Sequence, residues 1–416
     1  MPPSTWLELE TAGEFDALLP LGTKEAKKLT DANAHAVFKT YTVGVLTARD
    51  EVAYDFNRAP LVVRMEKFVE DYNAEVDRYH RAKKKQQKSI DIDKFVRSDL
   101  KWTHNLKQAL AMERSATTAP SSYRRSLYRP FCKKWLFFDR MLNERVYLTP
   151  GVFPNEKAEA ENMAICCTIH TQMPFTCMVT NVLPNEAIGG RNGQCFGLYT
   201  YSSDGSERSD NITDWAISEF QDHYGDPTIS KLDVFHYVYA ILHHPIYRER
   251  FAQNLQKEIP RVPAAKEFRL CARIGERLVD LHLNFEQAKR FELDWIENPD
   301  QPLSCRVTGR MRLNKEAATI EVNSSLTLAG IPEAAFDYVL GTRSALEWIV
   351  DQYRYEEDED GNVTSDPNDP DQEQYVVQLT ERVTTVSLET LELIRELPSE
   401  LDFSALQTGR KRVWSL

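Results

Sequence analysis

Hydrophobic side chains in residues 61–112 recur at helical spacing. Met65, Phe68 and Tyr72 fall on one face with charged residues opposite, which predicts two or more amphipathic helices. After a linker of small residues at 116–122, the pattern changes to short β-branched or aromatic runs separated by turn-forming residues. These runs predict the strands of a mixed β-sheet, at 135–139, 145–149, 163–170, 175–180 and 195–201.

The second half of the chain predicts helices around a small antiparallel meander. Residues 232–244 are apolar on nearly all sides, which indicates a buried helix, and Pro245 is suited to begin the next one. His243 and His244 are adjacent and would point about 100° apart on a helix, so we assign them to capping or core rather than to a ligand pair. Further helices are predicted at 265–283, 331–353 and 375–397, and the meander at 305–328.

These patterns predict an α+β protein with a helical lead-in, a central mixed β-sheet domain with helical insertions, and a helical C-terminal part. The segments are a lead-in at 1–60, a helical segment at 61–120, a mixed α+β domain at 121–330 and a helical part at 331–416. The last includes an acidic loop at 356–373, in which nine Asp/Glu and no Lys/Arg accompany one glycine and two prolines. This composition is typical of a flexible solvated loop.

Charge is unevenly distributed along the chain. The 416 residues carry a net charge of −12, yet residues 78–145 contain eighteen Lys/Arg and six Asp/Glu. One region is therefore basic enough to meet a polyanion while the remainder would repel it. No apolar run approaches the ~20 residues of a membrane span, and the first residues do not resemble a secretory signal, so we expect no membrane contact and a cytoplasmic location.

Seven cysteines are an odd number, and none forms a Cys-x-x-Cys pair. We therefore expect reduced core residues and neither a disulfide framework nor a metal site.

The most basic stretch, residues 121–145, interleaves cations with aromatic side chains. Arginine donates to phosphate oxygens and guanine edges, and aromatic rings add rigid apolar contact, so this mixture suits a nucleic-acid surface. A solvated basic face beside core aromatics is the alternative. We expect backbone phosphate contacts from four of its cations, namely Arg124, Arg125, Lys133 and Lys134.

Three other segments supply weaker candidates. The glycine-rich connection at 181–194 ends in Arg191, Asn192 and Gln194, whose side chains suit base edges, although a plain turn is the better explanation from the residues alone. Thr47 and Arg49 lie in a polar insert between two predicted strands and could touch DNA or form a structural turn. The basic run at 80–88 could contact the DNA backbone or be a solvated helix end.

Catalytic motifs are not found. There is no Walker A loop, no Asn-Pro-Pro-Tyr or Asp-Pro-Pro-Tyr, no glycine-rich loop for a methyl donor, no Gly-x-Ser-x-Gly and no His-Glu-x-x-His. We therefore expect binding rather than catalysis, with no cofactor and no metal. Two alternatives stay open: a protein-interaction module that docks on a methyltransferase or translocase subunit, and a cryptic nuclease.

Several long stretches resemble one family, in its order. They are YTVGVLTARDEVAYDF at 41–56, SLYRPFCKKWLFFDRMLNER at 126–145, GQCFGLYTY at 193–201, FHYVYAILHHPIYRERFAQNLQKEIPRVP at 235–263 and FDYVLGTRSALEWIVDQY at 336–353. Together they resemble the C-terminal specificity, or target-recognition, domain of type ISP restriction-modification enzymes. Those enzymes join a nuclease, an ATP-driven translocase, an adenine-N6 methyltransferase and this domain in one polypeptide.

The resemblance implies a role in host defence. The chain would recognise a sequence in double-stranded DNA, position it for adenine methylation and direct restriction, with the methyltransferase and translocase-nuclease parts as partners. Because the resemblance begins beyond the methyltransferase signature, residues 1–60 would be the connector that follows that domain. It also implies that the chain has no catalytic activity on its own and is either an excised fragment or a separate subunit.

Overall fold

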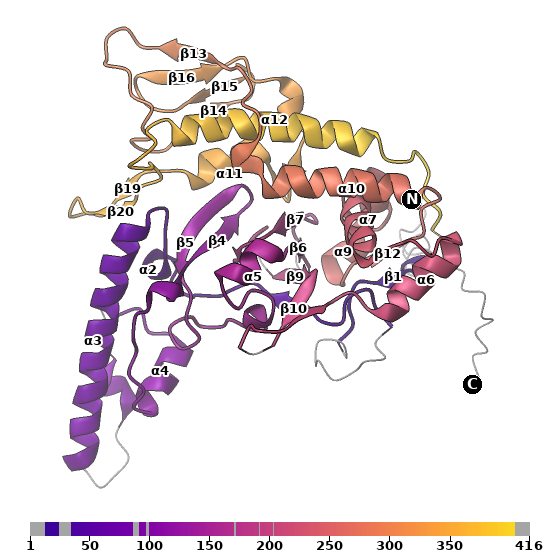
Figure 1. Ribbon diagram of the computed structural model, residues 1–416. Helices are drawn as coiled ribbons and strands as arrows, with labels where there is room; N and C mark the ends of the chain where they lie inside the picture. Colours follow the sequence, from indigo (N-terminus) through magenta and orange to yellow (C-terminus); the bar gives the residue numbers. More distant parts are fainter. Residues whose placement is uncertain are drawn as a thin grey trace, which may run out of the picture.

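The structure is a computed structural model that describes residues 13–24, 35–85, 91–96, 100–169, 172–190, 192–202 and 204–403 (Figure 1). Helices and several small β-sheets alternate along the chain, which confirms the predicted α+β class. No helix in these residues is long and apolar enough to cross a membrane.

A buried four-stranded sheet lies at the centre, with strands in the order β2-β9-β6-β7. Its strands are β2 (Thr42–Val43), β6 (Ala164–Thr168), β7 (Cys177–Thr180) and β9 (Gly193–Gly197). All of their residues are buried, as expected of short apolar runs covered on both faces. All seven cysteines are buried and free, which confirms their assignment to the core.

A second four-stranded sheet, in the order β3-β5-β4-β8, contains the basic stretch. Its strands are β3 (Tyr54–Asp55), β4 (Tyr123–Arg129), β5 (Cys132–Phe137) and β8 (Leu183–Pro184). The β4 and β5 strands form a hairpin in which Arg125 lies opposite Trp135. The predicted strand at 145–149 is wrong: Tyr147 has a left-handed φ of 47°, which interrupts an extended run, and a 3₁₀ turn follows at Thr149–Gly151.

Segments before residue 60 are built into these sheets. Strand β2 pairs with β9, strand β3 pairs with β5, and β1 (Leu19–Pro20) pairs with β12 (Arg261–Val262). A short helix, α2 (Asp50–Ala53), links β2 to β3. The described part of the predicted connector is therefore folded against the rest of the protein.

Most of the remaining helices pack beside the central sheet, and a long helix crosses two of the others. Helices α7 (Lys231–His243) and α10 (Phe268–Leu283) pack closely, because Gly275 leaves room for the backbone oxygen of His236. Helix α12 (Tyr375–Arg395) crosses above α10 and α11 (Ala345–Gln352) (Figure 1). The remaining helices of this part are α5 (Glu156–Glu161), α6 (Asp214–Tyr224), α8 (Pro245–Arg250) and α9 (Ala252–Lys257).

His243 and His244 are both buried, with 1% and 2% of their surface exposed. His243 Nδ1 lies 2.8 Å from the carbonyl oxygen of Tyr239, and His244 Nε2 lies 2.8 Å from that of Pro398. These contacts confirm their assignment to core and capping positions.

The predicted meander is part of a four-stranded antiparallel sheet in the order β13-β16-β15-β14. Its strands are β13 (Asp294–Glu297), β14 (Arg312–Asn314), β15 (Thr319–Glu321) and β16 (Leu326–Ala329). Three two-stranded hairpins complete the β structure: β10 (Tyr199–Tyr201) with β11 (Arg208–Asp210), β17 (Val339–Leu340) with β18 (Arg343–Ser344), and β19 (Glu356–Glu357) with β20 (Val363–Ser365).

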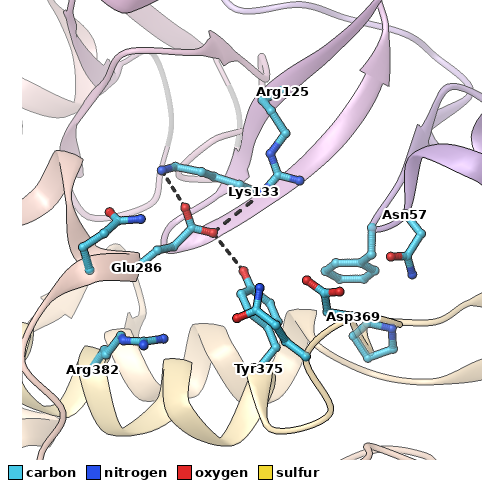
Figure 2. Close-up of a pocket in the computed structure, with 11 residues that line it drawn as sticks. Asn57, Arg125, Lys133, Glu286, Asp369, Tyr375 and Arg382 are labelled. Atoms are coloured by element: carbon cyan, nitrogen blue, oxygen red, sulfur yellow. Dashed lines mark hydrogen bonds and ion pairs between the residues drawn. The ribbon is translucent and has the colours of Figure 1, made fainter.

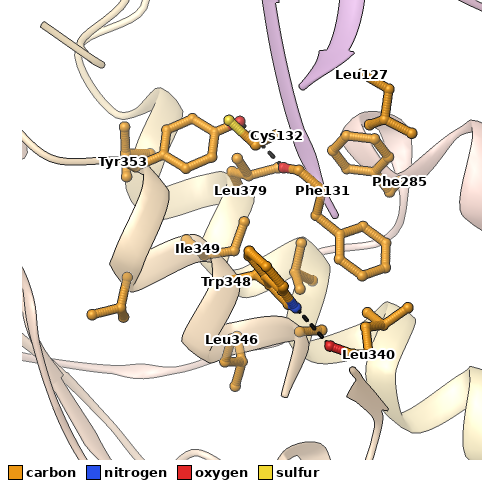
Figure 3. Packing of buried hydrophobic residues seen from close by; sticks show 14 of the residues in the cluster. Leu127, Phe131, Cys132, Phe285, Leu340, Leu346, Trp348, Ile349, Tyr353 and Leu379 are labelled. Carbon is orange, nitrogen blue, oxygen red and sulfur yellow. Dashed lines mark hydrogen bonds between the residues drawn. The ribbon is translucent and has the colours of Figure 1, made fainter. Parts of the chain in front are cut away.

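The turn of the β4–β5 hairpin is fixed in a hydrophobic core (Figure 3). Phe131 is fully buried, and its ring lies 5.3 Å from that of Phe285. The hydroxyl of Tyr353 donates to the carbonyl oxygen of Phe131 at 3.3 Å, and the indole of Trp348 donates to that of Leu340 at 3.0 Å. Because both indole and phenol are satisfied, these large rings can be buried here without an unpaired polar group.

A helical arm extends from the hairpin sheet (Figure 1). It consists of the 28-residue helix α3 (Arg58–Lys85), the 3₁₀ turn η2 (Ile92–Phe95) and helix α4 (His104–Ala111). The arm has its own hydrophobic cluster, which reaches the hairpin through Tyr123 and Phe137. The helical pattern predicted for residues 61–112 is confirmed.

Candidate nucleic-acid interface

Two cations of the β4–β5 hairpin converge on one carboxylate (Figure 2). Lys133 Nζ lies 2.9 Å from Glu286 Oε2, and Arg125 Nη2 lies 3.7 Å from Glu286 Oε1. The hydroxyl of Tyr375 donates to Glu286 Oε1 at 2.9 Å. Burial alone would raise the pKa of Glu286, but Lys133, Arg125 and Tyr375 outweigh it and hold this pKa below its ordinary value. Glu286 is therefore ionised near neutral pH and fixes both cations.

These groups line a polar cavity of about 340 Å³ between the hairpin, the 3₁₀ turn at Phe285–Gln287 and the start of α12. Arg382 enters from α12 (Figure 2), and its Nη2 donates to the side-chain oxygen of Gln378 at 3.3 Å. The lining residues are Phe56, Asn57, Arg125, Lys133, Glu286, Gln287, Pro367, Asp369, Gln372, Tyr375 and Arg382. Three cations face two carboxylates here, so the cavity suits an anion together with hydrogen-bonding groups.

The acidic loop forms one wall of this cavity. Asn57 Nδ2 donates to the carbonyl oxygens of Asp366 and Asn368, at 3.2 and 3.1 Å. Asn368 is buried and donates in turn to the carbonyl oxygen of Val307 at 2.8 Å. These bonds tie the second half of the loop to the turn between β3 and α3 and bring Asp369 beside the hairpin.

Lys134 lies on the opposite side of the hairpin from Lys133, because side chains alternate along a strand. Its Nζ is 4.2 Å from the ring centroid of Phe56 and 4.5 Å from that of Tyr128. Burial lowers the pKa of Lys134. The ammonium group is held mainly by aromatic faces, a favourable cation–π arrangement.

Arg124 faces the protein interior, with 3% of its surface exposed. Its Nε donates to Glu159 Oε1 at 2.7 Å, and its Nη2 forms an ion pair with the same oxygen and donates to the carbonyl oxygen of Phe153 at 2.9 Å. Burial raises the pKa of Glu159 to about 7, against the opposing effect of Arg124. In this structure the guanidinium of Arg124 therefore joins β4 to α5 and does not reach the surface.

Thr47 and Arg49 also lie inside the protein, at the base of the arm. The Thr47 hydroxyl donates to the Asp50 carboxylate, while Arg49 Nη2 donates to the Thr103 hydroxyl at 3.0 Å. Nε and Nη1 of Arg49 have no hydrogen-bond partner within the described part of the chain, and its guanidinium lies 5.0 Å from the Phe68 ring. Burial lowers the pKa of Arg49 to about 10, although nearby Glu144 and Glu51 oppose that shift.

The predicted base-reading segment is a glycine-rich turn before β9. Asn192 adopts a left-handed φ of 55°, and its backbone N–H donates to Glu186 Oε1 at 3.1 Å. Gln194 lies within β9 with 7% of its surface exposed, and its side-chain oxygen is buried without a partner among the described residues. Arg191 lies outside the described residues.

The structure thus brings Arg125 and Lys133 together and places the other described candidates elsewhere. Sequence reasoning missed Glu286, Tyr375 and Arg382, which complete the cavity. No local pattern marks them, because Glu286 lies on a 3₁₀ turn and Tyr375 and Arg382 lie on α12, and only tertiary packing brings these two elements to the hairpin. The described residues contain no group of three or more His, Cys, Asp or Glu that could hold a metal ion.

Three solved structures that are similar to this chain are DNA complexes. A cryo-EM structure of a DrdV–DNA complex matches with a TM-score of 0.81 and 32% sequence identity, covering 92% of this chain and 38% of that one. A nuclease-deletion mutant of the type ISP restriction-modification enzyme LlaGI, in complex with a DNA substrate mimic, matches with a TM-score of 0.79 and 31% identity over 93% of this chain and 34% of its own.

A third structure, the ATP-dependent type ISP restriction-modification enzyme LlaBIII bound to DNA, gives a TM-score of 0.79 and 28% identity over 93% of this chain and 24% of its own. The chain therefore spans between about a quarter and two fifths of the length of these three proteins. No curated protein sequence matches it.

The family model for the type ISP C-terminal specificity domain matches residues 36–382, which is most of the chain and includes all three four-stranded sheets, the arm and the cavity. The matched family is the specificity part of type ISP enzymes and not their catalytic part. The chain belongs to the type ISP C-terminal specificity domain family.

Proposed function

We propose that this chain recognises a specific sequence in double-stranded DNA on behalf of a restriction-modification enzyme. It would position that sequence for adenine methylation and direct restriction. The observation that carries the proposal is the match over 92% of the chain, at 32% identity, to part of a protein solved as a DNA complex. The cation-rich cavity beside the hairpin supports the same role.

The chain would act with separate catalytic parts, because it spans at most 38% of the length of the three DNA-bound proteins that it matches. We propose methyltransferase and translocase-nuclease parts as its partners, and no cleavage, methylation or ATP hydrolysis by this chain alone. Its place of action would be the cytoplasm, where the DNA that such enzymes survey is found.

Within this role, we propose that Arg125 and Lys133 contact DNA phosphates. Both already sit at a cavity, and Glu286 keeps them oriented until a phosphate competes for them. Lys134 would add charge from the other side of the hairpin. The remaining candidates would hold the interface in place without touching DNA. Arg124 would fix β4, and Thr47 and Arg49 would fix the base of the arm.

Base reading would fall to the turn before β9. We propose Arg191, Asn192 and Gln194 as its readers, because arginine and amide side chains form bidentate hydrogen bonds with guanine and adenine. Each good pair would contribute about 1–3 kcal/mol of discrimination against a wrong base.

The experiment begins with selection of a target from a pool of randomised duplexes, followed by binding of matched and mismatched fluorescent duplexes across a salt series. We expect a matched duplex to bind at least about tenfold more tightly than one with a wrong base pair, and affinity to fall steeply with salt. Equal affinity for matched and mismatched duplexes would overturn the proposal.

Two variants distinguish phosphate contacts from base-reading contacts. Arg125→Gln should weaken both duplexes alike and make the salt slope shallower by about 0.9, whereas Asn192→Ala should weaken the matched duplex alone. Arg273→Gln, an exposed cation on α10, is the matched control. Incubation of plasmid with the protein and Mg²⁺ should leave the DNA intact, and nicking that one acid substitution abolishes would instead identify a nuclease.

A further inference from the structure

The far end of helix α3 carries three cations on one side. Arg81, Lys84 and Lys85 are all exposed, and spacings of three and four residues place them on the same helical face. No ion pair joins any of them to a carboxylate among the described residues, and Asp77, one turn before Arg81, makes no ion pair with it.

On the side of these turns that faces the rest of the arm, the cations have carboxylate partners. Arg78 forms an ion pair with Glu75, and Lys83 forms one with Glu113, a residue that follows α4. The ring of Phe95 packs against the Tyr79 ring at 5.2 Å and under the Arg78 guanidinium at 4.8 Å. Cations that face the arm are therefore neutralised, whereas those that face away from it are not.

Unneutralised like charges at this spacing cost stability. Like-charged pairs three or four residues apart destabilise a helix by about 0.2–0.5 kcal/mol, and both Arg81–Lys84 and Arg81–Lys85 are such pairs. The helix dipole offsets this only in the last turn, where Lys84 and Lys85 lie. Arg81 lies before that turn, so the dipole does not account for it.

The arm is long enough to separate these cations from the cavity. The start of α3 packs against the hairpin through the cluster that includes Tyr123 and Phe137, while its end lies at the tip of the arm (Figure 1). A helix of 28 residues spans about 42 Å, the length of about 12 base pairs of duplex at 3.4 Å each. A duplex whose phosphates contact the cavity would therefore meet the tip of the arm about 12 base pairs away from those phosphates.

We propose that the outer face of α3, through Arg81, Lys84 and Lys85, binds duplex phosphates that flank the recognised sequence. This contact rests on the proposed function and adds to it a second DNA site that contributes affinity without base choice. Exposed lysine and arginine without carboxylate partners suit phosphates, and the net charge of −12 would repel DNA from most other surfaces.

The test uses the full chain and the triple variant Arg81→Gln/Lys84→Gln/Lys85→Gln. Matched duplexes carry flanks of either about 15 or about 2 base pairs on each side of the target. With long flanks, the salt slope of the variant should be shallower by about 2.7, for three lost phosphate contacts. With short flanks it should bind like the parent protein, and the matched-to-mismatched ratio should be unchanged.

A second triple variant, Lys257→Gln/Lys266→Gln/Arg273→Gln, removes three exposed cations from α9, α10 and the segment between them and should leave the slope unchanged. An unchanged slope for the arm variant, or equal losses with long and short flanks, would overturn the inference. Thermal unfolding should show both variants folded, since neither removes a buried group. If the parent protein does not discriminate between matched and mismatched duplexes, the proposed function fails, but the flank-dependent slope still tests the arm.

Discussion

Lys133 Nζ lies 2.9 Å from Glu286 Oε2, although 153 positions separate the two residues. The pair joins the basic hairpin to the 3₁₀ turn at Phe285–Gln287 and neutralises a cation at the edge of the cavity. Within the proposed function, the Glu286 carboxylate would compete with DNA phosphate for this cation.

Glu286→Gln should therefore increase non-specific DNA binding. The amide keeps a hydrogen-bond acceptor for Tyr375 but no longer neutralises Lys133 and Arg125, so each freed cation that gains a phosphate should make the salt slope steeper by about 0.9. The measurement is affinity for matched and scrambled duplexes across a salt series, in which discrimination should fall. Glu276→Gln, an exposed acid on α10, is the control, and a slope identical to it would refute the competition.

Arg124 and Glu159 form a buried ion pair, and replacing one of them should cost more stability than replacing the other. Loss of one partner of a buried ion pair costs about 3–5 kcal/mol, because the other charge is left uncompensated. The pKa of Glu159 is already raised to about 7, so Glu159 can accept a proton when Arg124 is lost, whereas arginine cannot shed one. Arg124→Met should therefore lower the free energy of unfolding less than Glu159→Met does, as measured by urea denaturation at pH 7.

The double variant Arg124→Met/Glu159→Met provides the control for that comparison. It removes both charges, so its loss of stability should be smaller than the sum of the two single losses. Strict additivity would show that the two side chains do not stabilise each other.

The fold could be predicted from the sequence where burial is continuous. Strands β6 and β7 are covered on both faces, and their short apolar runs are correctly predicted as strands. The apolar run at 145–149 looks the same in sequence, but Tyr147 adopts a left-handed conformation that no local pattern announces. The sequence also did not show that the second half of the acidic loop is held in place, because that depends on Asn57 in the turn after β3.

The candidate site could be predicted only in part. The cation-rich hairpin is visible in the sequence, but strand alternation sends Arg124 inward and Arg125 toward the cavity, and composition does not say which one faces solvent. Glu286 and Arg382 approach from distant segments, so their role follows from packing alone.

His282 should make stability depend on pH. Its Nδ1 lies 2.6 Å from the Tyr239 hydroxyl and its Nε2 lies 2.9 Å from the Thr390 hydroxyl, and burial, reinforced by Arg248, lowers its pKa to about 3. The unfolded chain binds this proton below about pH 6.5 and the folded chain does not, so stability falls as pH drops below 6.5. From pH 7.5 to 5.5 this loss is about 1.4 kcal/mol.

His282→Gln tests that dependence. The variant should be less stable than the parent at pH 7.5, because the amide does not reproduce both hydrogen bonds, but the gap should narrow by about 1.4 kcal/mol at pH 5.5. Other titrating groups, including Glu159, cancel in this difference. Urea denaturation at the two pH values measures it, and a constant gap would contradict the assignment of a neutral buried imidazole.

The close approach of α10 and α7 should make Gly275 intolerant of a methyl group. A Cβ at this position would lie 1.9 Å from the backbone oxygen of His236, and backbone cannot move aside as a flexible side chain can. Alanine in a helix is intrinsically better than glycine by about 1 kcal/mol, so any loss in Gly275→Ala must come from packing and exceed that gain. We expect a net loss of about 3 kcal/mol in the free energy of unfolding, which urea denaturation would measure.

Gly309→Ala is the matched control, because no atom lies within 4 Å of the added group, and it should change stability by less than about 0.5 kcal/mol. If Gly275→Ala were as stable as the parent, the two helices would have to lie further apart than this structure places them.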